Sequence, residues 1–315
     1  MEDDLPTARP IDRVIDGVLR RSPLQLAARS RARGRLAVLA YHGVDRETGF
    51  EKQVRWLADN TSVISLDQLL THLTEATPLP PRPCLITFDD GRVSVHHAGL
   101  PVLRSLGLPA VVFVVAGLIG RDEPYWWDHV KALVAAGGHS DLVTATGPIA
   151  VARSLKRVPN NVRLEAIAQL QASTVTKPDV RSAQLDVNQL RDLEAAGIEV
   201  ASHSWSHPCL DQCSAEVVHD EVRRAHTSLT GMLDHPPRAF AYPNGNVTSV
   251  ARAAVRDEGY PVAFAFDHAL QPLPINDPLV VARVRVNSEM SLDRFATVVS
   301  GLHPWVLRRL KRVSS

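Results

Sequence analysis

Two carboxylates and two histidines have the types and spacing of residues that hold a metal ion. Each pair directly follows an apolar run that predicts a strand: Asp89-Asp90-Gly91 after residues 84–88, and His203 and His207 after residues 198–202. Residues four apart face the same side of a helical turn, so the two imidazoles can bind one Zn²⁺-like ion, with the Asp90 carboxylate as third ligand. Gly91 permits the bend that brings both carboxylates into one pocket. An Asp-Asp-Gly run alone is as typical of a turn as of a site, so the metal interpretation depends on the histidines.

Cys209 and Cys213 offer a competing interpretation, a structural zinc site built from thiols. They are spaced as C-x₃-C, and the one remaining cysteine is Cys84, so the chain has no second thiol pair. A closed thiol site would also leave no coordination position for water. We therefore interpret both as small buried residues, and three thinly spread cysteines exclude a disulfide scaffold.

The elements that must position these side chains follow a strand–helix alternation. From Arg35 onward, apolar or β-branched runs alternate with amphipathic segments, which predicts an α/β fold around a parallel sheet or barrel. The expected strands are 36–41, 84–88, 110–115, 198–202, 239–242, 262–264 and 280–286, and helices are expected to begin near Ser94, Asp186, Ser214, Asn246 and Ser291. The polar stretch 137–183 breaks the alternation and carries one helical pattern near 162–171, which indicates an insertion. Active sites in such folds lie at the carboxyl ends of the strands.

Length and composition bound the class of protein. The 315 residues make one large or two small domains, and 45% hydrophobic against 22% charged residues indicates a globular chain. Lys and Arg number 35 against 34 Asp and Glu, so no charge excess points to nucleic acid as a partner. The longest apolar run, 110–120, is shorter than the ~20 residues of a membrane-spanning helix, and no secretory signal block stands at the start. We expect a cytoplasmic protein, with association at the inner membrane surface as an option.

Basic amphipathic segments lie at both ends. Apolar residues at helical spacing between 11 and 19 precede four arginines between 29 and 35, and near the other end Trp305, Leu307 and Leu310 stand among basic residues. Two interpretations remain open: solvated flanks packed on the domain, or helices that lie on an anionic lipid surface. The expected organisation is an N-terminal segment 1–34, a catalytic domain 35–300 with the insertion at about 137–183, and a C-terminal basic helix 301–315.

The two motifs together resemble those of a known family. The TFDDG run at 87–91 and the HSWSH run at 203–207 are similar to the first two signature motifs of the polysaccharide deacetylases, the NodB-homology domain of carbohydrate esterase family four. The resemblance covers about 36–300 by order of elements and implies a distorted (β/α)₇ barrel, with flanking terminal helices and the helical insertion. It also implies one divalent metal ion held by Asp90, His203 and His207, with Asp89 as general base. Zn²⁺ is expected, with Co²⁺, Ni²⁺ or Fe²⁺ as alternatives.

The third motif of the family, typically Arg-x-Pro-Tyr/Phe, is only partly present. The run at 240–245 supplies Tyr242, Pro243 and Asn244, but Ala241 stands where the family has an arginine that orients the base. We nominate Arg283, on a late strand, for that role. The turn after Pro243 can direct backbone N–H groups, that of Asn244 especially, at a developing oxyanion, so the three residues are candidates for oxyanion or substrate binding.

The last family motif, Leu-x-His near the C-terminus, is not evident, and another histidine is a candidate for the general acid. The Tyr41-His42 pair ends the first strand and resembles a run in poly-N-acetylglucosamine deacetylases, a subgroup whose motif order is permuted. His42 then takes the acid's role, since the first and last strands of a barrel are neighbours. Trp127 is a candidate for stacking on a sugar ring, with buried packing as the alternative interpretation.

The expected activity is metal-dependent hydrolysis of an N-acetyl group from an amino sugar, polysaccharide, lipid-linked or small, to give a free amine and acetate. Two alternatives remain. A related hydrolase would cleave N-formyl, amide or O-acetyl bonds on a different substrate, because the motifs specify metal, water and base but not the acyl acceptor. A non-catalytic carbohydrate-binding barrel is permitted by the altered third motif.

Overall fold

The computed structural model describes residues 10–303 of the chain and the side chains from Val14 onward. Most of the C-terminal basic helix expected at 301–315 therefore lies outside the described residues. Within 10–303, no helix combines the length and the apolar character needed to cross a bilayer.

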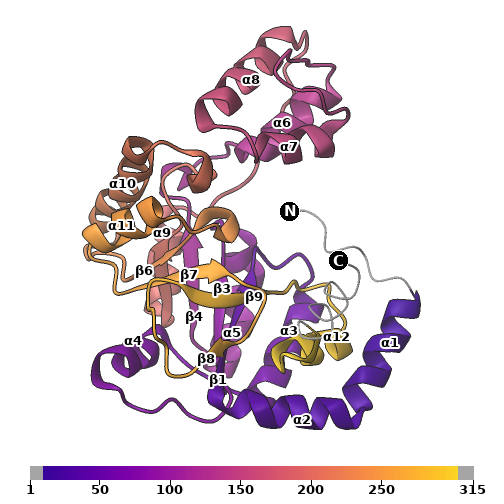
Figure 1. Cartoon of the computed structure of the whole chain (residues 1–315), viewed down its shortest axis with the longest axis vertical. Coiled ribbons are helices and arrows are strands. Elements are labelled where there is room, and N and C mark those ends of the chain that lie inside the picture. Colours follow the sequence, from indigo (N-terminus) through magenta and orange to yellow (C-terminus); the bar gives the residue numbers. More distant parts are fainter. Residues whose placement is uncertain (1–9, 304–315) are drawn as a thin grey trace.

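Seven parallel strands close into a barrel at the centre of the molecule (Figure 1). They are β1 (Arg35–Tyr41), β3 (Pro83–Phe88), β4 (Ala110–Val114), β5 (Ile198–Ser202), β6 (Ala239–Ala241), β7 (Val262–Phe266) and β9 (Val281–Arg285). Neighbours pair in chain order, and β1 closes the barrel by pairing with β3 on one side and β9 on the other. Two short strands pair with members of the barrel: β2 (Ser62–Val63) with β3 in parallel, and β8 (Gln271–Pro272) with β1 in antiparallel orientation. The barrel expected from the sequence is confirmed.

Helices follow the strands and cover the outside of the barrel. They are α3 (Glu47–Asn60), α4 (Leu66–Glu75), α5 (Leu100–Leu106), α9 (Val187–Ala195), α10 (Ala215–Leu233), α11 (Ser249–Asp257) and α12 (Leu292–Val299). Ser65 and Asp186 begin α4 and α9 with reciprocal capping boxes, and Ser214, Thr248 and Ser291 accept a backbone N–H at the start of the next three. These caps satisfy orphan N–H groups, which explains where each helix begins.

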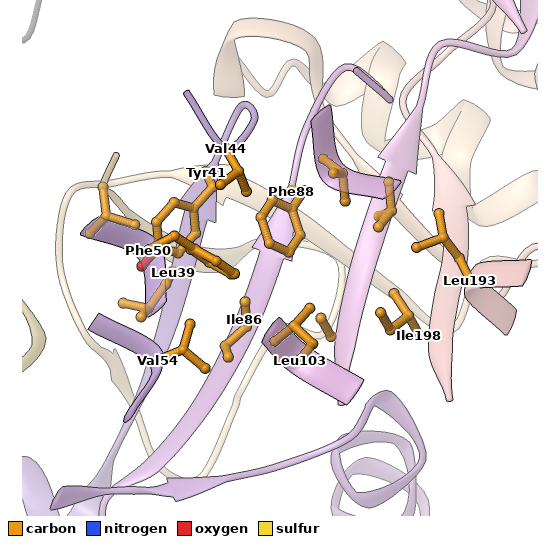
Figure 2. Close-up of a cluster of buried hydrophobic side chains, with 14 of the residues drawn as sticks. Leu39, Tyr41, Val44, Phe50, Val54, Ile86, Phe88, Leu103, Leu193 and Ile198 are labelled. Carbon is orange, nitrogen blue, oxygen red and sulfur yellow. The ribbon is translucent and has the colours of Figure 1, made fainter. Parts of the chain in front are cut away.

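The strands are buried on both faces, and their side chains alternate between two cores. One face fills the barrel interior with residues such as Val38, Leu85, Phe113 and Phe264. The opposite face packs against the helices, and Figure 2 shows Leu39, Tyr41, Ile86 and Phe88 meeting Phe50 and Val54 of α3 and Leu103 of α5. Two buried faces explain why each strand reads as a continuous apolar run rather than an alternating one.

The mid-chain insertion forms a separate helical layer at one end of the barrel (Figure 1). It contains α6 (Trp126–Ala135), α7 (Pro148–Leu155) and α8 (Asn160–Ser173), which share an apolar cluster that includes Val130, Leu155 and Leu170. The predicted pattern at 162–171 lies within α8. The helix α7 was not predicted, because its eight residues are too few to show a clear helical pattern.

Two N-terminal helices, α1 (Pro10–Arg21) and α2 (Pro23–Arg31), lead into β1 and pack on α12. Gln25 of α2 is buried and donates from Nε2 to the Ala296 carbonyl oxygen, 3.2 Å away. Arg20 of α1 forms an ion pair with Asp293 of α12. Polar contacts therefore attach these helices, while several of their apolar side chains remain exposed, among them Val14 and Leu26 at 66% and 70%.

Candidate active site

The two carboxylates stand at the end of β3, and the backbone turns sharply between them and the next helix. Asp90 adopts a left-handed conformation at φ +74° and Gly91 follows at φ +77°. In a regular strand neighbouring side chains point to opposite faces, but the left-handed turn brings both carboxylates toward the barrel mouth. A Cβ on Gly91 would meet the Val114 side chain at 2.9 Å, so the close approach of β4 also requires glycine there.

The two histidines come from the loop after β5 and face Asp90. Asp90 Oδ1 lies 3.8 Å from His203 Nε2 and 3.7 Å from His207 Nε2, and all three side chains are buried. Their ligand atoms lie within 4.8 Å of one another. Ligands ~2.1 Å from one tetrahedral ion are about 3.4 Å apart, so the separations fit a divalent cation after small adjustments. A carboxylate with two imidazoles is a donor set that suits Zn²⁺, Co²⁺, Ni²⁺ or Fe²⁺.

Hydrogen bonds fix the His203 imidazole and the backbone of His207. His203 Nδ1 lies 2.7 Å from the Ala241 carbonyl oxygen on β6, an acceptor that requires the proton on Nδ1 and leaves the Nε2 lone pair toward Asp90. His207 sits at φ +56°, and its backbone N–H donates to Ser204 Oγ at 3.1 Å. The pair is therefore presented by an ordered loop rather than by a helix, although its spacing suggests a helical turn.

Glu221 of α10 holds this loop and was missed by the sequence analysis. Its Oε2 accepts the backbone N–H groups of Trp205 and Ser206 at 3.0 and 2.8 Å, and its Oε1 accepts the Ser206 hydroxyl at 2.6 Å. The carboxylate is nearly buried. One glutamate in an amphipathic helix resembles any solvated residue in the sequence, so no local signal could have identified it.

Arg283 reaches Asp89 through the barrel interior. Its Nη1 donates to Asp89 Oδ1 at 2.6 Å and its Nη2 to Oδ2 at 3.0 Å, and both side chains are buried. Burial alone would raise the pKa of the Asp89 carboxyl, but the charges of Arg283, His203 and His42 outweigh it, so the pKa lies below its ordinary value. The structure thus brings the nominated arginine to the carboxylate that needs a counter-charge.

His42 lies beside Asp89 because β1 and β3 pair in register. Tyr41 is opposite Phe88, and the Asp89 N–H donates to the Tyr41 carbonyl oxygen at 2.8 Å. His42, the first residue after β1, therefore emerges at the same barrel end as Asp89. Its ring is half-buried and parallel to that of Phe266 of β7, with centroids 6.3 Å apart. A histidine there can exchange a proton with a group bound near the two carboxylates.

The turn after β6 places Asn244 at the same end, while Tyr242 points elsewhere. Asn244 adopts φ +56° within the short helical turn Pro243–Gly245. The Tyr242 side chain is fully buried in the outer core, and its hydroxyl donates to the Leu279 carbonyl oxygen at 3.1 Å. This corrects the expectation that the Tyr242 side chain binds substrate; the residue follows the strand alternation and its ring faces the helices. Pro243 is also buried and contributes the turn.

Trp127 does not present a face to substrate, which corrects the expected stacking role. It is 1% exposed, stacks on Tyr125 with centroids 4.6 Å apart, and contacts the His207 ring at 4.7 Å in a T-shaped arrangement. The sequence of an aromatic pair before a helix does not show whether the rings are buried or exposed. Here the apolar core of the insertion buries Trp127. Trp127 therefore packs behind a candidate metal ligand.

Comparison with known proteins identifies the family of the chain. A sequence model of the family described as Polysaccharide deacetylase matches residues 76–263, more than half of the chain. The chain belongs to the polysaccharide deacetylase family. YxkH of Bacillus subtilis (strain 168), a polysaccharide deacetylase homologue, is 26% identical over 111 residues. That match covers 33% of this chain and 40% of YxkH, so the chain spans less than half of that relative.

Solved structures similar to this polysaccharide deacetylase share its fold. The Streptococcus pyogenes deacetylase PplD, in complex with acetate, is 15% identical with a TM-score of 0.60, covering 84% of this chain and 98% of PplD. IcaB from Ammonifex degensii is 20% identical with a TM-score of 0.60, covering 85% and 97%. A de-N-acetylase from Aggregatibacter actinomycetemcomitans is 18% identical with a TM-score of 0.56, covering 84% and 99%. At these identities the likeness establishes the barrel alone.

Proposed function

We propose that this polysaccharide deacetylase family member is a metal-dependent hydrolase that removes the N-acetyl group of an amino sugar, giving acetate and a free amine. The observation that carries the proposal is the buried Asp90, His203 and His207 cluster next to a second carboxylate, Asp89, that has its own guanidinium partner. Names of the structural neighbours support it, since one is a deacetylase in complex with acetate and another a de-N-acetylase.

Asp90, His203 and His207 would hold one divalent cation, which we expect to be Zn²⁺. When bound, the cation polarises the acetyl carbonyl and lowers the pKa of water from ~16 toward ~7. Asp89 accepts the proton of the attacking water, and Arg283 keeps its carboxylate ionised and oriented toward that water. A lone buried carboxylate would favour its protonated form, so the arginine preserves the base.

The later proton transfer falls to His42. An amine is a poor leaving group unless it is protonated, and His42 and Asp89 directly follow the neighbouring strands β1 and β3. The backbone N–H of Asn244, in the turn after β6, is our candidate for a hydrogen bond to the developing oxyanion. Base, acid and oxyanion donor thus come from β3, β1 and the turn after β6.

Release of acetate, or of formate from the N-formylated sugars, over a panel of acylated sugars tests the proposal. Purified protein is stripped of metal, reloaded with Zn²⁺, Co²⁺, Ni²⁺ or Fe²⁺, and incubated with N-acetylglucosamine oligomers and their O-acetylated or N-formylated counterparts. We expect acetate from the N-acetylated sugars only after reloading. Full activity in stripped protein contradicts the metal role, and exclusive turnover of O-acetyl or N-formyl sugars contradicts the substrate.

We further propose that α1 and α2 bind the anionic surface of a membrane. Five exposed apolar side chains lie on them: Val14, Ile15, Val18, Leu24 and Leu26. Residues 17–35 contain six arginines and no acidic residue, although the whole chain has a net charge of +1. Val14, Val18 and Arg21 line one open hollow at the contact with Asp293, whose charge Arg20 neutralises. The exposed apolar side chains would enter the lipid surface, and the arginines would be attracted to its anionic headgroups.

A further inference from the structure

The helical insertion contacts the site directly, through side chains near the start of α6 and the end of α7. The Tyr125 hydroxyl lies 2.9 Å from the Asp90 carbonyl oxygen, and Trp126 Nε1 donates to the His207 carbonyl oxygen at 3.1 Å. Lys156, just after α7, donates from Nζ to Asn244 Oδ1 at 3.2 Å. The insertion is therefore built onto three segments that carry site residues.

Lys156 connects the insertion to the side chain of Asn244. It is half-buried, and its ammonium also lies 5.4 Å from the centroid of the Trp127 ring that backs His207. On the other side, Asn244 Nδ2 donates to Cys209 Sγ at 3.4 Å, in the loop that follows His207. The Asn244 amide thus links the insertion to the loop that carries the candidate metal ligands.

The Asn244 backbone needs such a link. A φ of +56° is sparsely populated outside glycine, although asparagine tolerates it better than most residues. Strained conformations persist where surrounding contacts enforce them, and they cluster at functional sites. Among the described residues of this turn, the side chain of Asn244 is the group held by hydrogen bonds from two other segments.

We propose that Lys156 is a positioning residue for hydrolysis: by holding the Asn244 side chain, it aims the Asn244 N–H at the oxyanion. This inference rests on the proposed function. The strength of an oxyanion donor depends on its aim, because the charge to be stabilised exists only in the transition state. Removing one such donor costs 10²–10³ in kcat, and loosening it costs less, so we expect about a tenfold loss without Lys156. The loss falls on kcat while KM is nearly unchanged.

A double-mutant cycle tests the proposal. Lys156→Met keeps the aliphatic stem and removes the donor, and Asn244→Gly keeps the positive φ and the N–H but removes the acceptor. Lys177→Met, an exposed lysine of the same insertion, is the matched control. We expect Lys156→Met to lower kcat about tenfold, Lys177→Met to be neutral, and Lys156→Met to have no further effect in the Asn244→Gly background. Lys156→Arg, which retains a donor, restores part of the rate.

Hydrogen exchange at the turn separates this inference from the proposed function. Lys156→Met is expected to speed amide exchange in the peptide around 242–246, whereas Lys177→Met leaves it unchanged. Equal kcat and equal exchange in Lys156→Met and wild-type protein overturn the inference while deacetylation stands. If acetate is released with none of the metals and from none of the N-acetylated sugars, the proposed function fails. Unchanged amide exchange in Lys156→Met would then also refute the link between Lys156 and the Asn244 turn. An additive loss in the double variant shows that Lys156 acts other than through Asn244.

Discussion

Arg283 and Asp89 form a buried, two-pronged ion pair although 194 positions separate them in the chain, with N···O distances of 2.6 and 3.0 Å. The guanidinium comes from β9, whereas the resembled family motif would place an arginine at the position of Ala241 on β6. Both strands contribute inward-facing residues to one barrel, so a guanidinium can reach the same carboxylate from either. The altered third motif is therefore a relocation of the charge within the barrel.

Replacing Arg283 should change the pH dependence of the reaction. The guanidinium lowers the pKa of Asp89 against the effect of burial, so Arg283→Met raises that pKa. Since the base acts when deprotonated, the acidic limb of the kcat/KM profile moves to higher pH, and the rate loss is larger at pH 6 than at pH 8. Arg283→Lys recovers part of the rate, because an ammonium lacks the planar fork. If the acidic limb of the profile does not move in Arg283→Met, Arg283 does not control the ionisation of Asp89.

Candidate metal ligands are tested by metal content. Asp90→Ala and His207→Ala each remove one of three donors, so we expect bound metal to fall well below one ion per chain and acetate release to be lost. His97→Ala, which removes an exposed histidine elsewhere, should retain a full complement. Metal analysis of dialysed protein decides the question, and full occupancy in both ligand variants would show that the ion binds at a different place.

The proton-donor assignment makes a different prediction. His42→Gln should lower kcat by about 10²–10⁴ because the leaving amine loses its acid. Bound metal should be unchanged, since His42 is not among the clustered ligand atoms of the described residues. Turnover and metal content measured on the same preparation separate the two effects. A rate close to wild type would exclude His42 from the mechanism.

Glu221 should influence metal affinity without touching the ion. Its carboxylate accepts three hydrogen bonds from Trp205 and Ser206, in the loop between the two histidines proposed as ligands. Glu221→Gln cannot accept all three equally well, and support of this kind is worth roughly 10–100-fold in metal affinity. Competition with a chelator measures the change, with Glu216→Gln on the exposed side of α10 as control. Equal affinities would mean that the loop holds its shape unaided.

Vesicle co-sedimentation tests the surface of α1 and α2. We expect binding to vesicles of mixed neutral and anionic phospholipid, weaker binding at high salt, and little binding to neutral phosphatidylcholine. Val14→Ser with Val18→Ser should reduce binding several-fold. Ile149→Ser with Leu164→Ser, which removes comparably exposed apolar residues from the insertion, should not. Equal sedimentation of both double variants contradicts the proposal, as does a stable dimer in solution that covers α1.

Strands and the convergence of the site were predictable from local sequence. Each barrel strand is buried on both faces, so its apolar run stands out, and expected and observed bounds differ by at most two residues. Parallel strands end at one edge, which brings the residues after β1, β3 and β5 together whatever their distance along the chain. That rule explains why His42, Asp89 and His203 meet.

Side-chain direction and support were not predictable. Tyr242 and Trp127 are aromatic residues next to site motifs, and whether such a ring faces substrate or core depends on packing that a short motif does not encode. Glu221 and Lys156 act through contacts with distant loops. Their roles depend on how α10 and the insertion dock, which is set by tertiary structure.

Closure of the barrel by β1 between β3 and β9 has a consequence for synthesis. During synthesis Asp89 leaves the ribosome long before Arg283, because 194 positions separate them in the chain. Enclosing a carboxylate without its counter-ion is strongly unfavourable, so we expect the interior to close around Asp89 only once β9 is present. A polypeptide that stops before residue 281 has every proposed metal ligand but lacks Arg283 and the strand that closes the barrel, so we expect it not to form the site.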